Sequence, residues 1–290
     1  MKPPFPCPTL TWRNDTYPSI QYSNPQLNCG GETVVITGAG SGVGRETAVA
    51  FATAGAKHIL LFGRNEPNLK ETEVQILQVR ESTRVSVFVG DVTDETVVKQ
   101  VADTIDTWNV IVHCAAYMSA PAPIAEADID DYFKSYETNV KSLVILVKYF
   151  LPKASPTNAS FLALVTGTVT LPPPMLLGLS GYLISKLAIS KTIEYLAAEN
   201  AHVSFFAVHP GFVDTYLFRR SGAIPEKMPM DTAQLAAGFN LWMASPRAKF
   251  LSGRSVWANW DVDELMSMKE EIVRGSKLTY VLEGWPFELA

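Results

Sequence analysis

The sequence is poor in the features that mark secreted, membrane-embedded and nucleic-acid-binding proteins. Its three cysteines, Cys7, Cys29 and Cys114, have no metal-like spacing, so we expect neither a disulfide framework nor a metal site. Residues 1–6 lack the apolar run of a signal peptide, and the longest apolar run, 143–151, is broken by Lys148 and too short to span a membrane. The 24 basic and 29 acidic residues give a net charge of −5, which offers no basic surface to nucleic acid. We therefore expect a soluble, cytoplasmic protein with no nucleic-acid or membrane partner.

Residues 1–30 hold six of the 19 prolines and show no helical or strand periodicity. We interpret them as an extension packed on the surface of a domain and anchored by Trp12 and Tyr17, with disorder as the alternative. Residues 31–290 contain no linker or internal repeat, and the chain's 47% hydrophobic content can fill one large core. We interpret 31–290 as a single domain.

Apolar runs of strand length alternate with longer segments of helical period throughout that domain. Strands are predicted at 34–37, 58–62, 85–89, 110–114, 161–165, 203–208 and 255–260, and the main helices at 42–54, 66–81, 94–105, 130–151 and 180–200. Parallel strands need crossover helices, so this order predicts an α/β protein. The expected fold is a doubly wound parallel sheet, Rossmann-like, with about seven strands and helices on both faces.

A glycine-rich turn follows the first predicted strand and opens the first helix. The stretch is Thr33-Val-Val-Ile-Thr-Gly-Ala-Gly-Ser-Gly-Val-Gly44. Its glycines allow a tight turn and let a diphosphate approach the free N–H groups of a helix N-terminus. An ordinary strand-to-helix turn is the alternative. The cofactor contacts expected here are Gly38, Ser41, Gly42, Val43 and Gly44.

The ends of the second and third strands bear on which dinucleotide the turn would hold. Gly63-Arg64-Asn65 offers no carboxylate for ribose hydroxyls, whereas Arg64 suits a 2′-phosphate. This favours NADP(H) over NAD(H), a solvated surface arginine being the alternative. Asp91 is placed to accept from the adenine amino group, or else belongs to the turn before the next helix.

Tyr182 and Lys186 open a long helix with i, i+4 spacing, which places the phenol and the ammonium on one helix face. A nearby cation stabilises a phenolate and lowers the pKa of the tyrosine, which makes it usable as an acid or base. A helix surface pair is the alternative.

These motifs, taken in order, resemble the short-chain dehydrogenase/reductase family over residues 32–260. The matches are Thr37 to Gly44 for T-G-x-x-x-G-x-G, Asp91-Val92 for the adenine-contacting pair, Asn139, Tyr182 with Lys186, and Pro210-Gly-Phe-Val-Asp-Thr215 for P-G-x-x-x-T. Residues 12–18, 256–261 and 282–286 resemble a fungal branch, which implies secondary metabolism.

The resemblance implies an NADP(H)-dependent oxidoreductase that transfers a hydride between nicotinamide and a hydrophobic ketone or secondary alcohol. Tyr182 would be the acid or base, Lys186 would hold the nicotinamide ribose, and Asn139 would hold a water linking Lys186 to solvent. Val213 and Thr215 would fix the carboxamide of the nicotinamide. Residues 215–250 would form a lid whose Phe218, Ile224 and Met228 give an apolar wall, and the two long helices would pair copies into a dimer or tetramer.

Two departures from the family pattern stand out. The run N-A-G after the fourth strand is here Cys114-Ala115-Ala116, still expected beside the cofactor, with Cys114 as inert packing rather than a nucleophile. The serine expected after the fifth strand is also missing. Strand alignment puts Gly167 in its place, whereas spacing from Tyr182 favours Thr168 or Val169, and Thr168 is the candidate hydroxyl. These departures keep open a non-redox alternative, an isomerase, a cyclase or a cofactor-binding pseudoenzyme.

Overall fold

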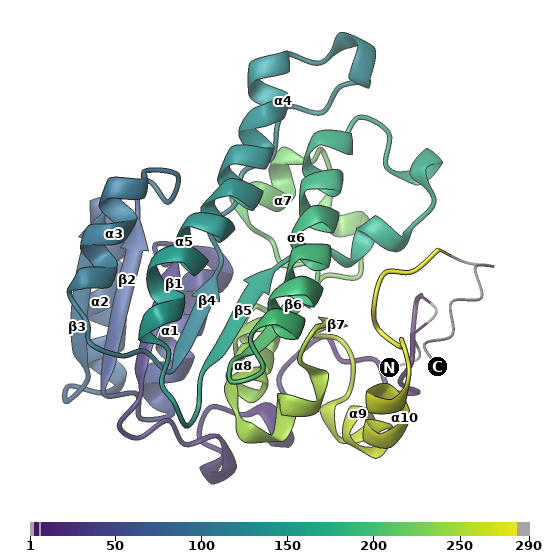
Figure 1. Cartoon of the computed structure of the whole chain (residues 1–290). Helices are drawn as coiled ribbons and strands as arrows, with labels where there is room; N and C mark the ends of the chain where they lie inside the picture. The colour runs from purple at the N-terminus through teal and green to yellow at the C-terminus, as the bar shows by residue number, and fades with distance from the viewer. Residues whose placement is uncertain (1–2, 6, 283–290) are drawn as a thin grey trace.

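The computed structural model describes residues 3–5 and 7–282. In this part of the chain one sheet of seven strands runs in the order β3-β2-β1-β4-β5-β6-β7, and every neighbouring pair is parallel (Figure 1). The predicted α/β class and doubly wound sheet are confirmed, with small shifts at the strand ends. The strands are β1 Thr33–Thr37, β2 His58–Gly63, β3 Arg84–Val89, β4 Val110–His113, β5 Ser160–Leu164, β6 Ser204–His209 and β7 Arg254–Trp257.

Helices cover both faces of the sheet because alternate strand residues point to opposite sides. Val34 and Ile36 of β1 pack in the core beneath α1, α2 and α8, whereas Val35 packs in the core beneath α3, α5 and α6. The helices are α1 Gly42–Thr53, α2 Glu66–Val79, α3 Glu95–Asp103, α4 Ile129–Tyr136, α5 Ser142–Phe150, α6 Ser180–Glu199, α7 Tyr216–Arg220, α8 Ala233–Ala244, α9 Val262–Ser267 and α10 Lys269–Arg274.

The long helix predicted at 130–151 is interrupted. Helices α4 and α5 are joined by a π-helical turn, Glu137–Lys141, and α5 ends at Phe150, two residues before Pro152. The turn places Asn139, fully buried, at the inner side of the helix pair. The helical pattern of this segment predicts its helices correctly, but the π-helical turn between them depends on contacts of Asn139 with residues distant in sequence.

The predicted lid, residues 215–250, is too long. Helix α8 is buried at every position from Leu235 to Ala244 and packs against α1, so it belongs to the core. An apolar surface on all sides of a helix indicates such burial. The part of the predicted lid outside the core is therefore the segment with α7 and the loop up to Asp231.

The N-terminal extension, as far as it is described, lies against the C-terminal part of the chain. Trp12 is 1% exposed and forms an antiparallel bridge with Trp260. Arg13 donates to Asp261 Oδ2 at 2.7 Å, and Tyr17 is buried beside it. Burial of the two aromatic side chains supplies the free energy that orders this segment.

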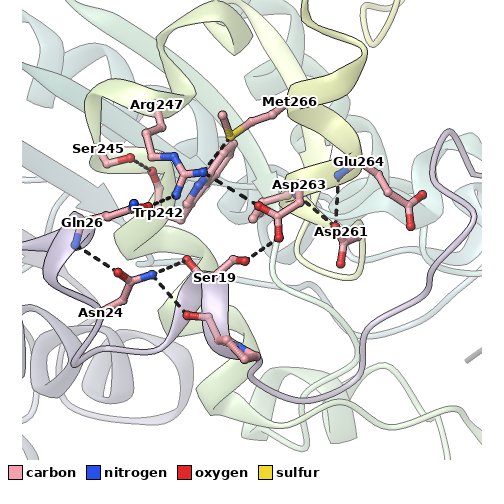
Figure 2. Close-up of polar contacts among 12 residues, drawn as sticks. Ser19, Asn24, Gln26, Trp242, Ser245, Arg247, Asp261, Asp263, Glu264 and Met266 are labelled. Carbon is pink, nitrogen blue, oxygen red and sulfur yellow. Dashed lines mark hydrogen bonds and ion pairs between the residues drawn. The ribbon is translucent and has the colours of Figure 1, made fainter.

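A polar network continues this contact (Figure 2). Arg247 Nη1 donates to Gln26 Oε1 at 2.6 Å, and its Nη2 lies 3.8 Å from Asp263. Ser19 Oγ donates to Asp263 Oδ2 at 2.5 Å, while Asn24 Nδ2 donates to the carbonyl of Ser19 at 3.3 Å. Residues 19–26 are thus tied to the segment that follows α8 and to α9.

Two further expectations from the sequence concern the tail at 282–286 and the absence of a membrane-spanning segment. Residues 283–286 of the tail that resembles a fungal branch lie outside the described residues. No helix in the described ranges combines the length and apolarity that crossing a bilayer requires.

Candidate active site

The glycine turn packs so tightly that side chains are excluded from its inner surface. A Cβ at Gly38, where φ is +66°, would lie 2.7 Å from the backbone nitrogen of Ala115. A Cβ at Gly44 would lie 2.4 Å from the carbonyl oxygen of Gly38. The turn therefore packs closely without side chains in between, and its exposed residues Ser41 and Gly42 stand at the N-terminus of α1, where the free N–H groups suit the phosphates of a dinucleotide.

A cleft of about 440 Å³ runs from this turn along the carboxyl ends of the strands. Most of the predicted site residues line it: Gly38, Ser41, Gly42, Val43, Gly44, Arg64, Asp91, Val92, Cys114, Ala115, Tyr182, Lys186 and Thr215. Asn139, Thr168 and Val213 do not line it. Val213 is buried and forms a parallel bridge with Asp231. The glycine cradle and the elongated cleft fit a dinucleotide.

Arg64 stands at the outer end of the cleft, directly after β2. Its Nη1 lies 3.9 Å from Asp91 Oδ2, and the two side chains are 63% and 42% exposed. The Asp91 carboxylate also accepts from the backbone and hydroxyl of Thr93 at 2.9 and 2.8 Å. An ion pair so exposed is weak, so the guanidinium of Arg64 can turn to a phosphate in the cleft.

Tyr182 and Lys186 lie in the first turns of α6 and are both buried. The Nζ of Lys186 is 5.8 Å from the centre of the Tyr182 ring and donates to the carbonyl of Leu164 at 2.7 Å. Burial lowers the pKa of Lys186 to about 7, so the amine is only partly charged at neutral pH. Burial raises the pKa of Tyr182 above its ordinary value, and a lowering of that pKa by Lys186 stays a prediction.

Asn139 holds the loop that follows β4. Its Oδ1 accepts from the N–H of Tyr117 at 2.8 Å, and its Nδ2 donates to the carbonyl of Tyr117 at 2.9 Å. Nδ2 also donates to Ser185 Oγ on α6 at 2.8 Å. These contacts give the π-helical turn its cause, because they draw Asn139 inward. The water link to Lys186 stays a prediction.

The end of β4 is held by His113 rather than by an asparagine at position 114. His113 Nδ1 lies 2.8 Å from Thr37 Oγ1 on β1, and its Nε2 lies 3.1 Å from Ser142 Oγ on α5. Both ring nitrogens are therefore satisfied, as expected for a packing histidine. Burial raises the pKa of the Cys114 thiol to about 12, which keeps it protonated and a poor nucleophile.

The position after β5 has no room for a side chain. A Cβ at Gly167 would lie 2.1 Å from Cε2 and Cζ2 of Trp257. Thr168 Oγ1 lies 2.8 Å from Thr166 Oγ1, and neither Gly167 nor Thr168 lines the cleft. The role of Thr168 as the substrate-binding hydroxyl stays a prediction.

Several residues of the cleft were absent from the sequence-based candidates, and Tyr117, Met118 and Arg220 are among them. Tyr117 and Met118 follow β4 and the Cys114-Ala115-Ala116 run, so their place at a strand's carboxyl end was a usable signal. Arg220, at the end of α7, had no such signal, because its partners are distant in sequence.

Comparison with known proteins identifies similar sequences among short chain dehydrogenases. The short chain dehydrogenase family model matches residues 32–224. A short chain dehydrogenase/reductase of Claviceps purpurea (strain 20.1) is 35% identical over 274 residues, covering 92% of this chain and 91% of the relative. The short chain dehydrogenase mpl6 of Monascus purpureus is 32% identical over 291 residues, covering 94% of this chain and 97% of that protein.

Solved structures share the fold. The oxidoreductase yciK from E. coli has a TM-score of 0.72 at 20% identity, covering 80% of this chain and 97% of that chain. A short chain dehydrogenase from Shigella flexneri 2a, complexed with NADP, has a TM-score of 0.72 at 21% identity, covering 80% and 99%. By its family match and its fungal relatives, together with this fold, the chain belongs to the short-chain dehydrogenase/reductase family.

Proposed function

We propose that the protein is an NADP(H)-dependent oxidoreductase that interconverts a hydrophobic carbonyl compound and its secondary alcohol. One observation carries the proposal. Tyr182 and Lys186 line the same cleft as the glycine turn and Arg64, so a proton donor and a dinucleotide site are adjacent.

In the reducing direction, Tyr182 donates its phenolic proton to the carbonyl oxygen. Its raised pKa means that it holds that proton at neutral pH. Lys186 lies one turn further along α6, with its Nζ 5.8 Å from the centre of the Tyr182 ring, and is the amine that we assign to return a proton to the phenolate. A nicotinamide, when bound, would supply the hydride.

Support for NADP(H) rather than NAD(H) comes from the residues after β2. Arg64 is exposed at the cleft, and no carboxylate stands at 63–65 to repel a 2′-phosphate. The Shigella flexneri structure with NADP is a fold relative, which fits the same preference. The apolar side chains of Met118 and Leu217 line the cleft and favour a hydrophobic substrate.

The crowding at Gly167 favours one alternative. If Gly167, rather than Thr168, is the equivalent of the family's serine, the site loses one hydrogen bond to the substrate oxygen, which lowers the rate by on the order of 10²-fold by analogy with other lost donors. A non-redox protein of this fold, an isomerase, a cyclase or a cofactor-binding pseudoenzyme, would tolerate that loss. Such a protein binds NADPH without consuming it.

The test is a fluorescence titration of the purified protein with NADPH and with NADH, followed by a carbonyl screen that records NADPH oxidation. We expect saturable, tighter binding of NADPH and steady oxidation with at least one apolar ketone. Tyr182→Phe is expected to keep NADPH affinity and to lower turnover by at least about 10²-fold. Unchanged turnover in that variant contradicts the proposed chemistry, and NADPH binding without oxidation by any substrate supports the alternative.

Assembly into a homodimer or tetramer is part of the same proposal. Helices α4, α5 and α6 carry exposed apolar side chains, Phe133, Val144, Ile184 and Tyr195. Exposed apolar side chains on neighbouring helices favour burial against a second copy. Light scattering after gel filtration measures the mass, and a mass near the 31.8 kDa of one chain contradicts the assembly.

A further inference from the structure

Helix α7 lines the cleft through Tyr216, Leu217 and Arg220 and is held at both ends. Figure 1 shows it beyond the carboxyl ends of the strands, close to α4 and α6. At its N-terminus, Thr215 caps the helix by accepting from the N–H of Phe218 at 3.1 Å. Thr215 also packs on the glycine turn, since a Cβ at Gly42 would lie 2.9 Å from Thr215 Cγ2. This end of α7 therefore rests on one wall of the cleft.

The other end of α7 is bound to the opposite wall through Arg220. Its Nε donates to the carbonyl of Met118 at 2.5 Å, and its Nη2 donates to the hydroxyl of Tyr117 at 3.1 Å. The same Nη2 lies 3.9 Å from Asp131 Oδ1. The guanidinium is about one quarter exposed, as is the Asp131 carboxylate, so these contacts are shielded from bulk water more than a surface pair is.

Tyr117 and Asp131 form the fixed half of this contact. The Tyr117 hydroxyl donates to Asp131 Oδ1 at 2.5 Å, and Asp131 Oδ2 accepts from the N–H of Ala120 at 2.7 Å. The ring of Tyr117 is close to two cations, with Arg220 Cζ 5.2 Å and Lys134 Nζ 5.0 Å from its centre. Because Asn139 also binds the backbone of Tyr117, the wall is rigid where Arg220 attaches.

We propose that Arg220, Tyr117 and Asp131 form a clasp that holds α7 at the cleft, and that Arg220 is a positioning residue that sets the rate at which the dinucleotide is released. The segment from Thr215 to Arg220 contacts the glycine turn at one end and the loop after β4 at the other, so we infer that detachment of one end of α7 speeds the exit of a ligand between those walls. The Arg220 end is held by charge-assisted hydrogen bonds, and the Thr215 end by packing. The clasp stands on its own contacts, whereas its effect on release rests on the proposed NADP(H) site.

The clasp itself is tested without any cofactor, by hydrogen exchange of the amides in residues 216–222. Arg220→Met keeps the length and apolar stem of the side chain and removes the guanidinium. We expect exchange in this segment to become at least about tenfold faster, with no change in α6. Arg219→Met is the matched control, because Arg219 lies on the same helix, is 68% exposed and binds only its near neighbour Asp214, at 2.7 Å, among the described residues.

Release is tested by stopped-flow displacement of bound NADPH. Arg220→Met is expected to raise the dissociation rate by roughly tenfold or more, and Arg219→Met to leave it unchanged. Tyr117→Phe, a smaller change that keeps the ring, is expected to raise it less, which gives a second variant if the first folds poorly. If Arg220 had only a structural role, its replacement would lower the melting temperature, but the dissociation rates of the three variants would not follow this order.

The outcomes separate the two ideas. Equal exchange in Arg220→Met and Arg219→Met overturns the clasp. Faster exchange in Arg220→Met with an unchanged NADPH dissociation rate refutes the proposal that the clasp controls release. The clasp would then be a structural contact alone. If the unchanged protein does not bind NADPH at all, the proposed function fails, and the exchange experiment still decides the clasp.

Discussion

Replacement of Gly167 by alanine tests the most crowded glycine near the predicted substrate site. The added Cβ would lie 2.1 Å from two carbons of the Trp257 ring, well inside the roughly 3.5–4.0 Å at which carbon atoms pack. The Trp257 side chain cannot move aside freely, because neighbouring rings surround it. Its ring centre lies 4.6 Å from the ring centre of His209 and 5.9 Å from those of Trp260 and Trp12. Gly167 is not among the glycines with positive φ, so strain in the backbone is not involved.

Overpacking of a buried site costs about 1–3 kcal/mol, and we expect the upper half of this range here. An unfolding entropy of about 2.1 cal/mol/K per residue gives roughly 0.6 kcal/mol/K for a chain of 290 residues. The melting temperature should therefore fall by about 3–5 °C, as followed by far-UV circular dichroism.

Two comparisons decide whether the indole is the cause. Gly275→Ala is the control, because its added Cβ would have its nearest neighbour at 3.5 Å, and it should change stability by less than about 0.5 kcal/mol. In a Trp257→Leu background, Gly167→Ala should cost much less than in the unchanged protein, giving a coupling energy of about 1 kcal/mol or more. A Gly167→Ala protein that melts like the unchanged one, or a cost that is the same in both backgrounds, refutes the reasoning.

Four further changes test other parts of the structure. Arg64→Ser is expected to weaken NADPH binding at least about tenfold and to leave NADH binding unchanged, as measured by calorimetry; equal loss for both speaks against a 2′-phosphate contact. Burial lowers the pKa of Lys186 to about 7, so the unfolded chain binds more protons between about pH 7 and pH 10 and stability rises with pH there. Urea titrations across that range should show the rise, and Lys186→Met should flatten it. Burial lowers the pKa of His209 to about 3, so stability falls as pH falls from about 6.5 to 3, and His209→Phe should reduce that fall in acid-unfolding curves. Trp12→Ala removes an indole that is 1% exposed and should cost about 3–5 kcal/mol in denaturant unfolding, whereas a cost under about 1 kcal/mol would mean that the N-terminal segment contributes little.

The sheet could be predicted from sequence because its signals are local. Runs such as Val34-Val35-Ile36 are typical of a buried strand, and the glycine turn between β1 and α1 indicates where the strand ends and the helix begins. The order of these elements then fixes the fold, since parallel strands need helical crossovers. Most of the cleft residues from Gly38 to Thr215 follow from the same order, because they lie at or just after a strand's carboxyl end, whereas Tyr182 and Lys186 come from the start of α6.

What escaped prediction depends on contacts between distant segments. The π-helical turn at Asn139 exists because its amide binds Tyr117, and nothing in the helical pattern of 130–151 records that partner. The clasp joins Arg220 to Tyr117 across 103 positions of sequence. The lid was set too long for another reason: α8 is apolar on all sides, and this pattern, taken by itself, already indicates a core helix.

The pairing of Trp12 with Trp260 fixes when this protein can finish folding during synthesis. Arg13 and Asp261 are 248 positions apart, and ribosomes add about 5–20 residues per second, so the indole of Trp12 waits roughly 10–50 s for its partners. During that interval the aromatic side chains of the N-terminal segment are solvent-exposed and can bind other nascent chains. A polypeptide that stops before residue 260 keeps this surface uncovered permanently, which makes truncated products targets for chaperones and for aggregation.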